Sequence, residues 1–230
     1  MSANTVDSVS ASVSSGGTVT FPGDWITVAN GGILRLRHTS AGGNNTHTVD
    51  LKELLLENGA TFQSYNTSLG NVSRNMSNPV SLGTGGSVTI RLQSDNGSAY
   101  SNTLRINGAL TGSSDINLTA ALQGQSGERR LLYVASASNT YSGNWTVAGD
   151  GTTDNARRAY LVSEAAGALG SGTVTLNTRA QLRSGATGAL DSLYGVALTT
   201  STSTLQLTNA WNQGRAVLSM TAGTVDLGEA

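Results

Sequence analysis

The chain has 230 residues, of which 29 are glycine, 12% are charged and 5% are aromatic. A compact globular enzyme of this length usually carries more charge and more large core residues, and a disordered chain lacks regular alternation of aliphatic residues. The net charge is −1 and the basic residues are scattered, which argues against a nucleic-acid partner. The chain contains no cysteine, which excludes a disulfide scaffold, a Cys-ligated metal and a thiol nucleophile. These values favour a β protein with a thin aliphatic core and many tight turns.

Short runs of alternating apolar and polar residues occur along the whole chain, and Gly, Asn, Ser or Thr bounds each run. Such runs are typical of strands joined by turns. The predicted strands lie, in chain order, at 18–21, 33–36, 54–56, 88–92, 104–106, 116–118, 131–134, 145–147, 160–162, 174–176, 196–198, 205–207, 217–218 and 225–227. Residues 49–59 also fit a helical face, and we favour a strand there; a single helical turn near 165–169 is the other helical candidate.

A short step, in which an apolar-polar-apolar run leads into an asparagine, recurs along the chain. It ends at Asn30, Asn58, Asn107 and, more loosely, Asn209. Interpreted as one, two and four turns of roughly 25 residues, the intervals between these positions predict a coiled repeat.

Two all-β architectures remain after the strand assignment. Strands at this spacing also suit a β-sandwich. Short strands, variable turns and small inward residues favour a parallel coil, because stacked coils place equivalent residues about 4.8 Å apart. We therefore predict one all-β domain over 1–230, a single-stranded parallel β-helix (β-solenoid) of about nine or ten coils. The Ser/Asn-rich stretch at about 64–86, which contains Asn78-Pro79, is predicted to be an irregular loop.

Residues 106–182 carry a more specific pattern. It begins with Ile106-Asn107-Gly108-Ala109-Leu110 and continues through Asn139-Thr140-Tyr141-Ser142-Gly143 and Trp145-Thr146-Val147. It ends with Ala168-Leu169-Gly170-Ser171-Gly172-Thr173-Val174-Thr175-Leu176 and an A-x-L strand at 180–182. The order and approximate spacing resemble the autotransporter-associated β-strand repeat of bacterial autotransporter passenger domains.

The resemblance implies a right-handed parallel β-helix that is exported and structural or adhesive, and it implies no catalytic residues. The segment 149–158 departs from the family, which commonly has a short Gly-rich turn there. No translocator barrel is present, so direct membrane insertion is not carried over. Residues 1–30 contain no basic region followed by an apolar run. We therefore expect an extracellular or cell-surface location, with the signal peptide and anchor outside this sequence.

Few residues suggest a metal site. Asp150 and Asp154, with Asn155 beside them, offer oxygen ligands in a Gly-rich turn, as Ca²⁺ prefers, although an ordinary Asx turn explains them as well. His38 and His47 would converge on one ion if the segment between them were a turn, but we expect two exposed loop histidines. The sequence predicts no resident metal and no cofactor.

Candidate catalytic groups are dispersed. Polysaccharide-cleaving β-helices need clustered carboxylates. The nearest approximations are Glu53 with Glu57, and Glu128 beside Arg129-Arg130, and solvated edges explain both pairs. We predict that the protein is not an enzyme.

The aromatic residues suggest a ligand surface. Trp25, Tyr141, Trp145 and Trp211 would stack sugars if they lay on one outer face, whereas single aromatics in solenoids often cap or fill the core. These four residues are the candidates for glycan stacking.

The leading hypothesis is an exported bacterial cell-surface β-solenoid with a structural, adhesive or fibre-forming role. The alternative is a carbohydrate-active β-helix, either a polysaccharide lyase or hydrolase or a phage-type glycan-binding spike. Because the sequence stops on a strand pattern without a polar cap, we expect self-association end to end or stacking with further coils. Host or matrix glycans or proteins are the other expected partners.

Overall fold

The computed structural model describes residues 9–10, 18–20, 25–38, 45–67, 70–94, 101–122, 130–150, 158–208 and 217–227. Within these residues the chain forms 22 strands and no helix. Nine strands form sheet A: β1 (Val9–Ser10), β4 (Ile33–His38), β7 (Thr61–Asn66), β10 (Ser87–Ser94), β13 (Asp115–Leu122), β15 (Trp145–Ala148), β17 (Thr173–Leu176), β19 (Gly195–Leu198) and β21 (Val217–Met220).

Two further sheets complete the coil. Sheet B also has nine strands in the described part of the chain: β2 (Thr18–Thr20), β5 (Asn45–Asp50), β8 (Val72–Met76), β11 (Asn102–Ile106), β14 (Arg130–Val134), β16 (Ala159–Ser163), β18 (Ala180–Ser184), β20 (Thr204–Leu207) and β22 (Thr224–Asp226). Sheet C is shorter and contains β3 (Trp25–Val28), β6 (Glu53–Leu56), β9 (Val80–Leu82) and β12 (Leu110–Thr111).

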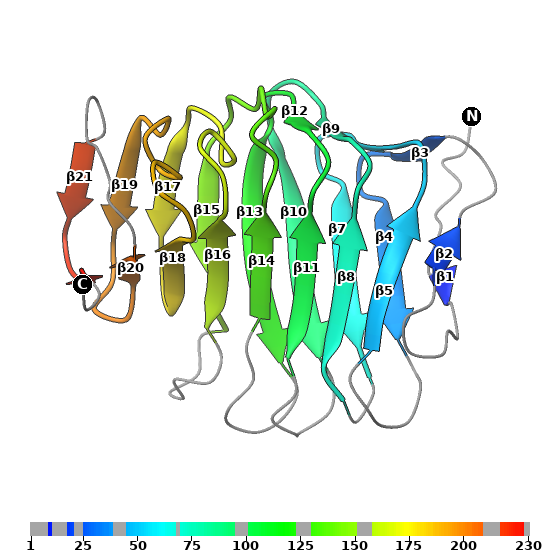
Figure 1. Ribbon diagram of the computed structural model, residues 1–230, viewed down its shortest axis with the longest axis horizontal. Helices are drawn as coiled ribbons and strands as arrows, with labels where there is room; N and C mark the ends of the chain where they lie inside the picture. Colours follow the sequence, from blue (N-terminus) through cyan, green and yellow to red (C-terminus); the bar gives the residue numbers. More distant parts are fainter. Residues whose placement is uncertain are drawn as a thin grey trace.

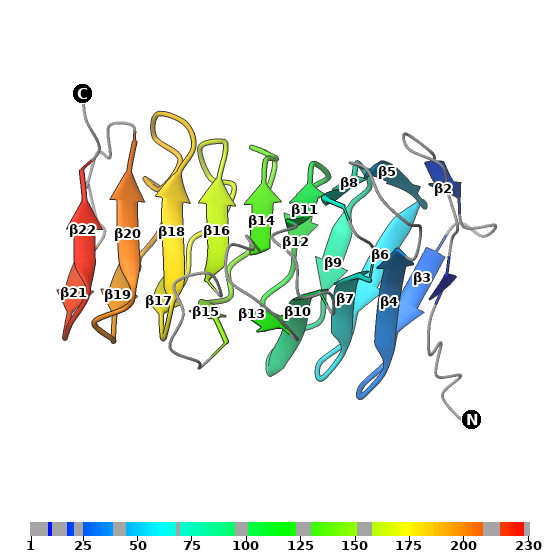
Figure 2. The ribbon, with the colours of Figure 1, turned by 90° about the horizontal axis from the view of Figure 1, so that it is seen from below.

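Every strand pairs in parallel with the equivalent strand of the next coil, so the chain winds into an elongated stack (Figures 1 and 2). The nine strands in each of the two long sheets agree with the expected nine or ten coils. The predicted all-β solenoid is therefore confirmed. In the described ranges no helix is long and apolar enough to cross a membrane.

The length of a coil follows from the strand register. Arg35 pairs with Gln63 of the next coil, 28 positions further along the chain, and Thr61 pairs with Thr89 in the same way. Closer to the C-terminus the step is shorter, because Thr199 donates a hydrogen bond to Asn177 of the preceding coil, only 22 positions earlier. The period predicted from the asparagine steps thus lies between two real coil lengths.

The core is a set of ladders that run along the solenoid axis. Residues of sheet A alternate, so every second side chain points inward and stacks on its equivalent in the next coil. One ladder is unbroken over seven coils, and each of its members is at most 2% exposed: Leu34, Phe62, Ile90, Leu118, Val147, Leu176 and Leu198. Burial of each such side chain contributes roughly 1.5–3 kcal/mol, so repetition of small aliphatics replaces the large residues of a globular core.

The asparagine steps do not all mark one corner of the coil. Asn30 and Asn58 are one coil apart, and Gly31 donates a backbone hydrogen bond to Gly59 at 3.3 Å. Asn107 instead follows β11 of sheet B, so the interval from Asn58 to Asn107 is not two turns. Strands of different sheets show the same apolar-polar-apolar run before a Gly-rich corner. The sequence pattern alone therefore does not tell which sheet a strand belongs to. Asn209 lies outside the described residues.

The irregular loop predicted at about 64–86 is wrong. This stretch contains the end of β7 and all of β8 and β9, in register with their neighbours. Pro79 directly precedes β9, where its missing N–H interrupts no ladder, and its carbonyl accepts a hydrogen bond from Leu54 N at 3.0 Å. Ser64 and Asn66 are buried inside the coil, and the other described Ser and Asn residues that suggested a loop occupy corners and outward positions.

Neither of the two candidate helices forms: the first segment contains strands and the second is a turn. Residues 49–59 hold the end of β5 and all of β6, as the favoured interpretation predicted. Residues 165–169 form a turn, in which Ala168 donates to Ala165 at 3.1 Å.

Candidate functional site

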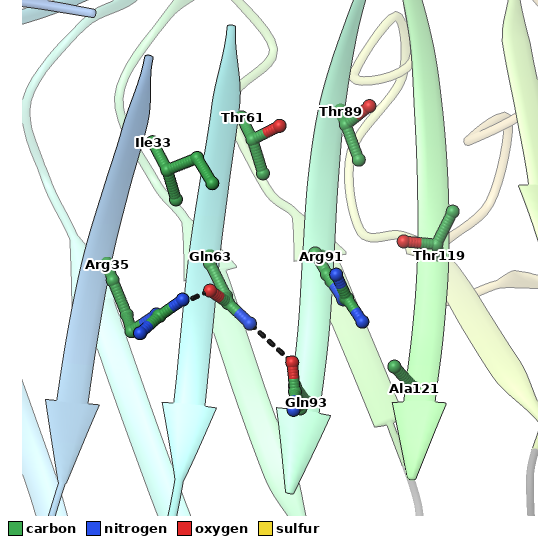
Figure 3. Close-up of a pocket in the computed structure, with 9 residues that line it drawn as sticks. All are labelled: Ile33, Arg35, Thr61, Gln63, Thr89, Arg91, Gln93, Thr119 and Ala121. Carbon is green, nitrogen blue, oxygen red and sulfur yellow. Dashed lines mark hydrogen bonds between the residues drawn. The ribbon is translucent and has the colours of Figure 1, made fainter. Parts of the chain in front are cut away.

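An open hollow lies on the outer face of sheet A. It measures about 690 Å³ and is lined by outward-facing residues of β4, β7, β10 and β13 (Figure 3). The lining residues are Ile33, Arg35, Thr61, Gln63, Thr89, Arg91, Gln93, Thr119 and Ala121. They alternate with the core residues of the same strands, so the pleat that builds the core also aligns this polar face.

A hydrogen-bonded ladder crosses the hollow. The parallel register places Arg35 opposite Gln63, and Gln63 opposite Arg91. Arg35 Nε donates to Gln63 Oε1 at 2.6 Å, and Gln63 Nε2 donates to Gln93 Oε1 at 2.5 Å (Figure 3). Gln63 is only 3% exposed, and these two hydrogen bonds hold both polar atoms of its amide.

The hollow and its rim are rich in guanidinium groups. The guanidinium carbons of Arg35 and Arg37 lie 5.3 and 5.8 Å from the centre of the Tyr65 ring. Arg91 is exposed and forms no hydrogen bond or ion pair within the described part of the chain. None of the nine lining residues is acidic. Guanidinium, amide and hydroxyl groups together favour a ligand that accepts hydrogen bonds and carries negative charge.

A second polar group lies inside the solenoid, where sheet A turns into sheet B. His38 Nδ1 and His47 Nε2 are 3.0 Å apart. Arg74, which is 2% exposed, donates to Ser64 Oγ at 2.6 Å, to Asn102 Oδ1 at 3.1 Å and to the carbonyl of Tyr65 at 2.9 Å. The guanidinium therefore ties the last residues of β7 to β8 and β11.

Burial controls the charge of this interior group. Burial, followed by the neighbouring His47 and Arg74, lowers the pKa of His38 to about 4. Burial and Arg74 also lower the pKa of His47. Burial lowers the pKa of Arg74 to about 9, so Arg74 stays charged at neutral pH while both imidazoles are neutral.

The histidine prediction was wrong in one respect and right in another. His38 and His47 do converge, but they lie in β4 and β5 and are 1% and 4% exposed rather than in an exposed loop. Both histidines occupy the same alternate positions as the core residues of their strands, and this pattern could have predicted that they face inward. No group of three or more His, Cys, Asp or Glu side chains with metal-site geometry occurs among the described residues.

Two of the four predicted sugar-stacking residues are core residues. Tyr141 and Trp145 are 1% and 0% exposed, and their rings meet edge to face at 5.7 Å. Trp145 Nε1 donates to the carbonyl of Leu169 at 3.0 Å. These side chains fill a corner of the solenoid, so the prediction that they stack sugars is wrong.

The remaining candidates are dispersed. Trp25 is 62% exposed in sheet C, with Lys52 Nζ 5.3 Å from its ring centre. Asp150 follows β15, whereas Asp154, Asn155 and Trp211 lie outside the described residues. Glu53 accepts a hydrogen bond from the Ser81 hydroxyl in the next coil, a structural contact within sheet C.

Sequence reasoning missed an aromatic group on the outer face of sheet B. Arg105 lies over Tyr133 at 5.3 Å and Arg183 lies over Tyr160 at 4.6 Å. Arg105 also forms an ion pair with Glu164, with Nη1 3.0 Å from Oε1. Here the cations are covered by aromatic and acidic neighbours, in contrast to Arg91 of sheet A.

Comparison with known proteins leaves the chain without a match. No family model, curated protein or solved structure matches it. The resemblance to autotransporter repeats therefore stays a prediction from the sequence.

Proposed function

We propose that this protein is a structural, fibre-forming module of a bacterial cell-surface β-solenoid, which associates end to end through its sheet edges. The observation that carries the proposal is the exposure of the core position Met220 in β21, which no residue of the described part of the chain covers. The repeat resemblance at 106–182 supports export and surface location, and the parallel stack of nine-stranded sheets supports a rigid rod.

The exposure of core positions changes abruptly at this coil. Leu218 and Met220 pair with Val196 and Leu198, which are each 1% exposed. Met220 is 47% exposed, because none of the described residues packs against the outer side of its coil. A further coil stacked there would bury Met220 as β21 buries Leu198.

The backbone of β21 offers the matching hydrogen bonds. Val217 N and Thr221 N donate to Tyr194 O and Leu198 O of the preceding coil, both at 3.0 Å. In a parallel sheet alternate residues bond to opposite neighbours, so the peptide groups of Leu218 and Met220 point to the open side. Such an edge is a template for another strand, from a second copy or from further coils.

The test compares two lysine substitutions in β21 whose side chains point to opposite faces of the strand. Met220→Lys places an ammonium group on the stacking surface of the core, and Ser219→Lys places the same charge on the outer face of β21. We expect the unmodified chain and Ser219→Lys to associate with rising concentration in light scattering, and to form linear particles in negative-stain images. Met220→Lys should stay monomeric with an unchanged circular dichroism spectrum.

Two results would count against the proposal. A chain that stays monomeric at millimolar concentration does not use this edge for association. Equal loss of association in both lysine variants would place the contact on the outer face instead. Surface location is tested separately, by protease treatment of intact source bacteria, which should remove the protein while leaving cytoplasmic markers intact.

A further inference from the structure

The hollow on sheet A suggests a binding function that does not depend on end-to-end association. It crosses four successive strands, so it extends over about 15 Å along the solenoid axis at the usual strand spacing. That length suits an extended chain laid across the strands better than a single small anion.

The polar groups in the hollow are already positioned. Gln63 is buried and bridges Arg35 and Gln93, which fixes the Arg35 side chain on the sheet surface. A ligand therefore meets a guanidinium whose conformational entropy is largely lost before binding, and this lowers the cost of association.

Charge on this face is unbalanced. Arg35 and Arg91 lie two strands apart, with Gln63 between them, and Arg37 extends the same face. Arg105 on the opposite sheet shows the contrasting case, because Glu164 neutralises it. A guanidinium binds a carboxylate through two parallel hydrogen bonds, so Arg91 is a ready site for one.

Hydroxyl groups complete the set of donors and acceptors. Thr61 and Thr89 pair across adjacent strands, and Thr119 of β13 pairs with Arg91. Their hydroxyls have no hydrogen-bond partner within the described ranges. Ile33 and Ala121 add small apolar surfaces at the ends of the hollow (Figure 3). Hydroxyls beside apolar patches suit sugar rings, which have both polar and C–H faces.

The aromatic residue on this face argues against a nucleic acid. Single-stranded nucleic acids bind through bases stacked on aromatic rings. Tyr65 is the aromatic residue of β7 that shares this outer edge, and the guanidinium groups of Arg35 and Arg37 already lie over its ring.

We propose that the outer face of sheet A binds an acidic polysaccharide, a chain whose sugars carry carboxylates, laid along the solenoid axis. Arg35 and Arg91 bind the carboxylates, and Gln63, Gln93 and the threonine hydroxyls bind the sugar hydroxyls.

The experiment uses the whole chain and a hexamer of galacturonic acid, with binding measured by isothermal titration calorimetry. The control ligand is the fully methyl-esterified hexamer, which keeps the sugar chain and removes its charge. Arg91→Gln is the main variant, because Arg91 is exposed and its loss does not disturb the fold. Arg35→Gln tests the ladder, and Arg183→Gln removes the same charge from the opposite face.

We expect the acid hexamer to bind at least tenfold more tightly than its ester and less tightly as salt rises. Loss of one guanidinium contact should weaken binding about tenfold in Arg91→Gln and in Arg35→Gln, equivalent to about 1.4 kcal/mol, and less than twofold in Arg183→Gln. Equal binding of acid and ester, no binding of the acid hexamer, or equal effects of Arg91→Gln and Arg183→Gln would each overturn the proposal. Tighter binding of a thymidine dodecamer than of the hexamer would also overturn it.

Discussion

The first and last parts of the solenoid differ in the number of strands in each coil. From β3 to β12 each coil has three sheets, and the chain takes 28 positions to return from Arg35 to Gln63. From β17 to β21 a coil has two sheets, and the return from Asn177 to Thr199 takes 22 positions. Sheets A and B continue through both parts without interruption. The coil shortens where sheet A passes into sheet B, because the aligned residues of β17 and β18, Leu176 and Ser184, lie 8 positions apart (184 − 176), whereas those of β10 and β11, Ile90 and Ile106, lie 16 apart (106 − 90). Two paired sheets suffice to propagate the stack.

The transition between the two parts is filled by aromatic residues. Sheet C ends at β12, and Tyr141 and Trp145 follow in the next coils as the largest buried aromatic pair of the described core. Backbone hydrogen bonds continue on the third side without a strand, for instance from Ser142 N to Gly112 O at 3.0 Å. The aromatic volume replaces the side chains that a third strand would contribute.

The strongest test of this interpretation is Trp145→Ala, which removes the buried indole from the core at the point where sheet C has ended. Removal of a fully buried aromatic side chain should destabilise the protein by about 3–5 kcal/mol, because the rigid strands on either side cannot collapse into the cavity. The matched control is Trp25→Ala, where the side chain is 62% exposed and the expected loss is under about 0.5 kcal/mol. Urea denaturation followed by circular dichroism measures both. A similar loss in the two variants would refute the role assigned to Trp145.

The interiors of the first and last parts of the solenoid differ in polarity as well as in shape. The buried polar residues of the early coils include His47 and Arg74, whereas Leu161 and Leu182 take the equivalent interior positions in the later ones. His38 is a third buried polar residue of the early coils. The buried imidazoles of His38 and His47, whose pKa values are lowered by burial, therefore belong to the early coils.

Acid should destabilise the early coils before the later ones. The folded pKa of His38 is about 4 and the unfolded value is 6.5, so the unfolded chain binds the proton at higher pH. The stability from this pair is fully present above about pH 7 and is lost as pH falls from 6.5 toward 4, by on the order of 2 kcal/mol. Hydrogen exchange should show earlier loss of protection in β4, β5 and β8 than in β17–β20. The double variant His38→Leu/His47→Leu should remove this difference, and uniform loss of protection along the stack would contradict the assignment.

The sequence predicts the strands better than it predicts their alignment. Alternation at Leu34, Phe62 and Ile90 requires only that each strand have one buried face, so strands and a solenoid follow from local pattern. The hollow depends on register. A repeat of about 25 residues, typical of coiled repeats, would set Arg35 opposite the core residue Ala60, whereas the actual register sets it opposite Gln63. An odd error in register exchanges the inner and outer faces, so no averaged repeat could assemble this site.

The smallest expected effect concerns an ion pair that spans β11, β14 and β16 of sheet B. Arg105 of β11 reaches past β14 to Glu164, which directly follows β16, and it also lies over Tyr133. Glu164→Gln should cost under about 1 kcal/mol, because Arg105 is partly exposed and a surface ion pair gains little in water. The loss should vanish at about 1 M salt, where screening removes the ion pair but leaves the contact with Tyr133. A larger, salt-independent loss in urea denaturation would mean that Glu164 stabilises sheet B by packing rather than by charge.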